Sequence, residues 1–132
     1  MQHDYKNYLT LDEFRERSGY DLLKRLEQGD FNNEEEAADR FMQDNFNELK
    51  SLISSKMGAQ WTNNFLQDIL TDANTDERIA ELKEGFIEAL VQHNIYRFEV
   101  GDPIACADSN LPRYSEHTIE ALVNNRIIFR GV

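Results

Sequence analysis

The sequence of 132 residues predicts an all-α fold, a small helical bundle with a non-helical C-terminal arm. Two long segments, residues 33–57 and 76–98, repeat apolar side chains every three or four positions, the period of an amphipathic helix. Helix-starting and helix-ending residues bracket both segments. Because this length suits one hydrophobic core, we expect a single domain with the bundle in residues 1–100, a loop in 101–114, and a short helix with the arm in 115–132.

Short helices are predicted before the first long segment. Thr10 and Glu13 have the spacing of a capping box, in which each side chain accepts a hydrogen bond from the other residue's backbone N–H. A helix therefore begins near Leu11, and Gly19 is suited to end it. Leucines on one side of residues 20–28 predict a second short helix.

The segment 33–57 has clear signals at both ends. Asn33 is a suitable N-cap residue, and Gly58 is a suitable stop. The first turn contains three consecutive glutamates, Glu34, Glu35 and Glu36. The helix dipole favours negative charge at this position, so the simplest interpretation is a solvated helix start.

Two further helices complete the predicted bundle. Residues 60–70 place their apolar side chains on one side, and Thr75 is the predicted N-cap of the helix over 76–98. Gly85 lies inside that helix, where glycine costs about 1 kcal/mol relative to alanine. This cost predicts that another helix packs closely at this position.

The C-terminal region combines a short helix and the arm. Ser115 is a suitable N-cap for a helix through about residue 123. The β-branched and aromatic residues that follow favour an extended conformation. We consider two roles for this arm: packing on its own domain, or pairing with another subunit by strand addition. The candidate contact residues are Arg126, Ile127, Ile128, Phe129 and Arg130.

No motif indicates catalysis, a metal or a cofactor. His3, His93 and His117 are scattered, and no metal-binding spacing joins them to cysteine or to one another. Cys106, the single cysteine, lies in the predicted loop without a nucleophile signature. We therefore predict no catalytic residue, no metal and no cofactor, and we interpret His93 as a residue favoured by the dipole near a helix C-terminus.

The charge balance limits the classes of partner. Aspartate and glutamate number 25 against 14 lysines and arginines, a formal net charge of −11. Such a surface opposes tight binding of nucleic acid, although it could line a passage through which DNA slides. No apolar run approaches the roughly 18 residues of a membrane span, and the N-terminus lacks the pattern of a signal peptide. We expect a soluble protein with no membrane partner.

Three features together resemble the head–tail connector (adaptor) proteins of long-tailed bacteriophages. The segment YLTLDEF at residues 8–14 is similar to the family's start of its first helix. The helices have a similar length and order, and the long helix over 76–98 closes the set. The capped segment over 114–122, followed by the apolar end over 126–132, is similar to the C-terminal region of many members.

This resemblance implies a virion protein at the head–tail interface, made in the host cytoplasm. The subunit would form a homo-oligomeric ring, commonly a dodecamer, between the portal protein and the stopper or tail protein, with DNA passing through without tight binding. It implies that Glu34, Glu35 and Glu36 could face the channel and that residues 126–130 could contact a partner. The first alternative is a small acidic regulatory protein that binds a basic partner. The second is an enzyme, which would require a pocket joining a carboxylate to His93, Cys106 or His117.

Overall fold

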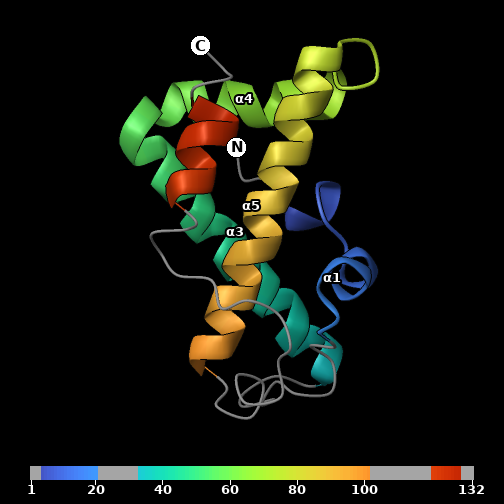
Figure 1. Cartoon of the computed structure of the whole chain (residues 1–132). Coiled ribbons are helices and arrows are strands. Elements are labelled where there is room, and N and C mark those ends of the chain that lie inside the picture. Colours follow the sequence, from blue (N-terminus) through green and yellow to red (C-terminus); the bar gives the residue numbers. More distant parts are fainter. Residues whose placement is uncertain (1–3, 21–32, 102–119, 129–132) are drawn as a thin grey trace.

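The computed structural model describes residues 4–20, 33–101 and 120–128, and the elements in these ranges are helical (Figure 1). The predicted all-α class is confirmed. Two predicted segments lie outside the described residues. They are the short helix over 20–28, of which only Tyr20 is described, and the loop over 101–114 with Ser115, of which only Gly101 is described. The elements are η1 (Tyr5–Asn7), α1 (Leu11–Ser18), α3 (Glu34–Met57), α4 (Ala59–Thr71), α5 (Glu77–Gly101) and the π-helix η2 (Val123–Ile128).

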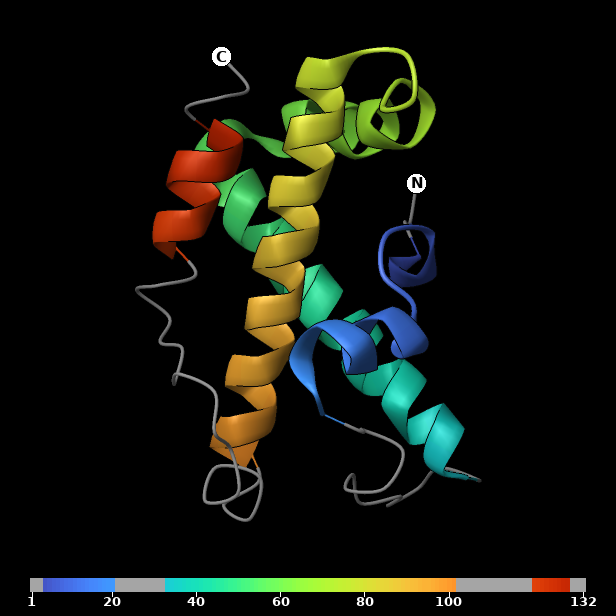
Figure 2. The ribbon, with the colours of Figure 1, turned by 45° about the vertical axis from the view of Figure 1, so that its right-hand side comes forward.

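Helix α5 is the centre of the bundle. It packs against α3, α4, α1 and η2. Figures 1 and 2 show α4 lying across one end of the two long helices, with η2 and α1 on different sides of α5. The helix runs to Gly101, beyond the predicted end at residue 98. Most of the core is therefore built around one long helix with apolar residues on several sides.

An aromatic cluster joins the N-terminal segment to this core. The ring of Tyr8 stacks on Phe46 with centroids 5.4 Å apart and meets the Phe86 ring edge-on at 5.3 Å. The buried Tyr8 hydroxyl donates a 2.9 Å hydrogen bond to the carbonyl oxygen of Leu66 in α4. Burial of a large aromatic side chain contributes roughly 1.5–3 kcal/mol. Tyr8 thus links α3, α4 and α5 at one point.

Most predicted helix ends are confirmed. The Thr10 hydroxyl accepts the Glu13 N–H at 3.1 Å, and the Asn33 side chain accepts the Glu36 N–H at 2.8 Å. Gly19 has a φ of 80°, in the left-handed region that glycine adopts without a Cβ clash. These caps satisfy backbone groups that a helix end leaves without intrahelical partners.

The predicted N-cap of α5 is wrong by one residue. Asp76, not Thr75, caps the helix, since its carboxylate accepts the Arg78 N–H at 2.9 Å. The Thr75 hydroxyl instead donates to the carbonyl oxygen of Asp72 at 3.2 Å. Both residue types are good caps, so the choice depends on the geometry of the turn after α4.

The predicted extended arm is also wrong for residues 126–128, which are helical. Val123 and Ile127 lie four residues apart, and both are fully buried. A Cβ atom on Gly85 would lie 3.0 Å from the Arg126 Cβ, so the absent side chain is what lets η2 approach α5. This confirms the close packing expected at Gly85. Packing against α5 has overridden the strand preference of the isoleucines.

Candidate protein-binding groove

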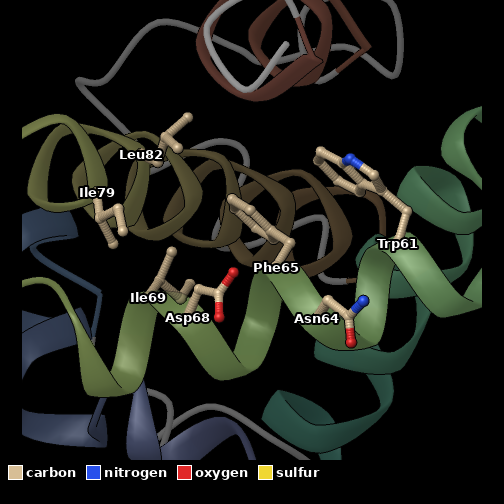
Figure 3. Close-up of a pocket in the computed structure, with 7 residues that line it drawn as sticks. All are labelled: Trp61, Asn64, Phe65, Asp68, Ile69, Ile79 and Leu82. Carbon is tan, nitrogen blue, oxygen red and sulfur yellow. The ribbon is translucent and has the colours of Figure 1, made fainter.

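An apolar groove with a volume of about 280 Å³ lies between α4 and α5 (Figure 3). Its apolar lining comes from Trp61, Phe65 and Ile69 of α4 and from Ile79 and Leu82 of α5. Figure 3 shows the α4 side chains directed toward α5. The groove is therefore a seam between two helices that the protein's own core leaves partly uncovered.

Two parallel aromatic rings form one wall of the groove. The centroids of Trp61 and Phe65 are 5.3 Å apart, with an angle of 7° between the ring planes. Phe65 is buried and meets the Phe86 ring edge-on at 6.0 Å, whereas Trp61 is only partly buried. The stack therefore continues the aromatic core outward to the surface. Such a rigid aromatic surface is typical of the anchor points of protein interfaces.

The local sequence explains why Trp61 is only partly buried. Gly58, with a φ of 88°, separates α3 from α4 and turns the chain. Trp61, Phe65 and Ile69 repeat at a spacing of four, so they share one face of α4. Leu66 and Ile69 are fully buried beneath α4. The apolar face of α4 is thus wider than the core it covers, and Trp61 marks its outer edge.

The rim of the groove is polar and acidic. Asn64 and Asp68 are exposed on α4. The nearby turn adds the exposed Asp72, Asp76 and Glu77. An apolar floor with an acidic rim is complementary to an apolar segment that carries a cation.

A second depression, of about 380 Å³, contains an ion-pair cluster between α3 and α5. Glu48 Oε2 lies 2.8 Å from His93 Nε2 and 2.7 Å from Arg97 Nε, and Arg97 Nη2 donates to Glu48 Oε1 at 2.9 Å. Burial raises the pKa of Glu48, but the hydrogen bonds and charges of Arg97 and His93 outweigh burial, and its pKa is lowered overall. The cluster favours an ionised carboxylate that joins the two long helices.

This cluster meets part of the requirement for an enzyme, because His93 and a carboxylate share a depression. A general-base histidine held by a carboxylate presents its other nitrogen to the substrate. Here Glu48 contacts Nε2, and Nδ1 is buried. The geometry is therefore that of an interhelical contact. Cys106 and His117 lie outside the described residues.

The predicted contact residues of the arm are not gathered in one exposed segment. Arg126 is exposed and pairs with Glu88 of α5 at 3.4 Å, whereas Ile127 is fully buried and Ile128 is partly buried. Phe129 and Arg130 lie outside the described residues. The described part of the arm packs on its own domain, which was the first of the two predicted roles.

The acidic run Glu34–Glu36 begins α3, as predicted. Glu35 and Glu36 are exposed, and Figure 1 places this end of α3 away from α4. The acidic run and the apolar groove are thus at opposite ends of the bundle. Among the described residues, no group of three or more histidine, cysteine or carboxylate side chains could hold a metal ion. None of the described helices combines the length and apolarity needed to cross a membrane.

Sequence reasoning placed the groove residues on apolar helix faces but assigned those faces to the core. The single tryptophan was a usable signal, because tryptophan is large and is rarely buried completely. For the ion-pair cluster, the spacing of His93 and Arg97 indicates a shared face of α5. Their partner Glu48 could be identified only once the pairing of α3 with α5 was known.

Comparisons of the chain with protein-family models, curated proteins and solved structures found no significant match.

Proposed function

We propose that the chain is a protein-binding structural subunit and, more specifically, a head–tail connector subunit of a long-tailed bacteriophage. In this proposal it forms a homo-oligomeric ring between the portal protein and the stopper or tail protein, at the head–tail interface of the virion. The observation that carries the protein-binding role is the α4–α5 groove, with its Trp61–Phe65 stack and acidic rim. The connector assignment draws on the resemblance of residues 8–14 and of the helix order to that family.

The groove takes over the contact role first assigned to the arm. Ile127 is fully buried against its own domain, so residues 126–128 are not available as an added strand. Trp61 offers a partly exposed aromatic surface, and aromatic anchors in apolar pockets supply much of the energy of protein interfaces. A partner with an apolar side chain next to a cation fits both the floor and the rim.

The charge distribution supports passage of DNA without tight binding. The formal net charge is −11, and the exposed Glu35 and Glu36 lie at the end of the bundle away from α4. An acidic wall repels phosphate, so DNA could move past it without adhering. In the ring, this end of α3 would face the channel.

The test is the mass of the purified chain by light scattering over a concentration series, alone and with a candidate portal ring added. A large ring, or stoichiometric addition to the portal, is the expected result. Trp61→Ala should weaken the association with the portal at least tenfold, because the substitution removes the outer wall of the groove. Gln60→Ala, at an exposed neighbouring position, is the matched control and should bind normally.

A stable monomer that does not bind the portal would contradict the connector proposal. It would favour a small acidic regulatory protein, which would then compete with DNA for a basic enzyme. Truncation after Asn125 is unsuitable as a test, because it removes the buried Ile127 and would disturb the fold.

A further inference from the structure

A stripe of side chains along α4 changes from apolar to acidic. Trp61, Phe65, Asp68 and Asp72 follow one another at spacings of four, three and four residues, so they share one face of the helix. The first three line the α4–α5 groove, and Figure 3 shows Trp61 toward one end of it and Asp68 toward the other. Asp72 is the exposed C-cap of α4. The stripe rises by about 16 Å along the helix, or roughly three turns.

The acidic end of the stripe lies at the helix C-terminus, where the partial negative charge of the helix favours cations. The last turn of α4 contains no basic residue, and Asp68 and Asp72 are at this end instead. The exposed Asp76 is close by, since its backbone N–H donates to the Asp72 carbonyl oxygen at 3.0 Å. Arg78 is exposed at the start of α5 but does not line the groove. A cation brought by a partner would therefore be attracted by the carboxylates and by the helix dipole.

The size and lining of the groove suit side chains that project from a partner protein. Its volume of about 280 Å³ lies below the roughly 300–1,000 Å³ of typical small-molecule sites. Of the seven described residues that line the groove, five are apolar and Asp68 alone is charged. The occupant should therefore combine apolar side chains with a cation that reaches Asp68.

Both walls of the groove are helices, and this favours a helical occupant. The backbone N–H and C=O groups of α4 and α5 are paired within each helix, so the groove offers no sheet edge to an extended segment. An extended segment would place unpaired backbone groups against Trp61 and Phe65, which is unfavourable. An α-helix pairs its own backbone groups, and its ridges of side chains fit the groove between two other helices.

Charge indicates that the occupant belongs to a different protein. Each copy of the chain has a formal net charge of −11, so a second copy would bring further acidic surface to the acidic rim. Arg17 and Arg126 are exposed but already pair with carboxylates of their own chain, at 2.8 Å from Glu84 and at 3.4 Å from Glu88. The complementary cation is therefore expected from a basic segment of another protein.

We infer that the α4–α5 groove binds an amphipathic helix of a partner protein. The helix lies along α4 for about three turns. Its apolar face covers Trp61 and Phe65, and a lysine or arginine at one end of that face pairs with Asp68 and Asp72. This helical partner presupposes that the groove binds protein, as proposed above, and does not require the connector role.

A display library of random peptides, each about 16 residues long and without tryptophan, tests this binding mode. The library is selected on the full chain and, in parallel, on Trp61→Ala. Peptides enriched on the full chain alone should carry apolar residues every three or four positions, with a lysine or arginine beside them. Trp61 is the single tryptophan, so titration with an enriched synthetic peptide should shift its emission to shorter wavelength and give Kd. Circular dichroism should show that the peptide gains helix as it binds.

A charge exchange tests the pairing at the acidic end of the groove. Changing the basic residue of the enriched peptide to glutamate should weaken binding to the full chain about tenfold or more. Asp68→Lys combined with Asp72→Lys should reverse this preference, so that the glutamate peptide binds more tightly. Gln67→Lys, at an exposed position of α4 outside the groove, is the matched control and should keep the original order of affinities. High salt should narrow the difference, because the charges lie at the rim.

Three outcomes would overturn the inference. A library with no enrichment on the full chain over Trp61→Ala would show that the groove does not take a peptide helix. Enriched peptides that stay non-helical when bound would show an extended occupant. A charge exchange that leaves the order of affinities unchanged would remove Asp68 and Asp72 from the contact.

The portal experiment separates this helical partner from the connector role, because it measures ring assembly instead of peptide selection. A chain that selects helical peptides but does not bind a candidate portal ring would contradict only the connector proposal. A chain that assembles with the portal but selects no helical peptide would contradict only the helical partner.

Discussion

Arg126 lies so close to Gly85 that a Cβ atom on the glycine would be 3.0 Å from the arginine Cβ and 3.3 Å from its carbonyl oxygen. This contact fixes η2 along α5 and buries Ile127 in the core. The same contact explains why a glycine stands inside a long helix, where it is otherwise unfavourable.

Gly85→Ala should therefore destabilise the protein. In an ordinary helix this substitution stabilises by about 1 kcal/mol, but here the added methyl group presses on the backbone of Arg126. We expect the free energy of unfolding to fall by about 1–3 kcal/mol, the usual cost of overpacking, as measured by urea denaturation. Ala80→Gly, near the start of α5, is a control that should cost only about 1 kcal/mol. A gain in stability for Gly85→Ala would contradict the close packing.

The helices were largely predictable because their signals are local. The apolar repeats in α3 and α5 and the caps at Thr10 and Asn33 act within a few residues along the chain. The conformation of residues 126–128 was not predictable in this way. These residues are helical because Ile127 is buried where η2 packs against α5, a contact between segments far apart in the sequence. The groove was missed for a related reason. Periodicity identifies the apolar face of α4 but not how much of that face the core covers.

The buried pair Asn45 and Asn94 joins α3 to α5. Asn45 Nδ2 donates to Asn94 Oδ1 at 2.8 Å, and Asn94 Nδ2 donates to the carbonyl oxygen of Leu90 at 2.9 Å. Asn94→Leu should cost about 1–3 kcal/mol, because it leaves the buried Asn45 amide without this acceptor. Urea denaturation of both single variants and of the double leucine variant gives the coupling energy. A double variant that loses the full sum of the single effects would show that the pair is not coupled.

Glu48 should make part of the stability dependent on acid pH. Its pKa is lowered from 4.5, so the ionised carboxylate contributes stability above that value, and the contribution is lost as pH falls through the lower pKa of the folded state. Glu48→Gln should lower stability at neutral pH, and the difference from the parent should disappear in acid. The side chains of Glu48 and Arg97 are 43% and 42% exposed, so solvent screening limits the effect to roughly 0.2–1 kcal/mol.

Thermal melts over a pH series, at low and high salt, measure this difference. High salt should reduce it, because the pair is partly exposed. Asp44→Asn removes the exposed partner of Arg40 and is the matched control, expected to have little effect at any pH. A difference for Glu48→Gln that persists unchanged in acid would assign the effect to packing instead of charge.

Tyr8 should make stability depend on alkaline pH with the opposite sign. Burial raises its pKa from 10.0 to about 12, so the protonated phenol contributes stability that is fully present below 10.0 and is lost as pH rises through about 12. Tyr8→Phe keeps the ring between Phe46 and Phe86 but removes the hydrogen bond to the Leu66 carbonyl. At neutral pH the variant should therefore be less stable by about 0.5–1.5 kcal/mol.

Above pH 10.0 this order should change, because phenylalanine cannot ionise and the parent must lose a buried proton. Denaturation at increasing pH should show the two stabilities converging and then crossing, while the absorbance of tyrosinate follows the ionisation in the parent. Tyr96→Phe, at a partly buried position on α5, is the control for the loss of a tyrosine hydroxyl. Parallel curves for Tyr8→Phe would mean that the Tyr8 hydroxyl exchanges freely with solvent. The link from the N-terminal segment to α4 would then rest on ring packing alone.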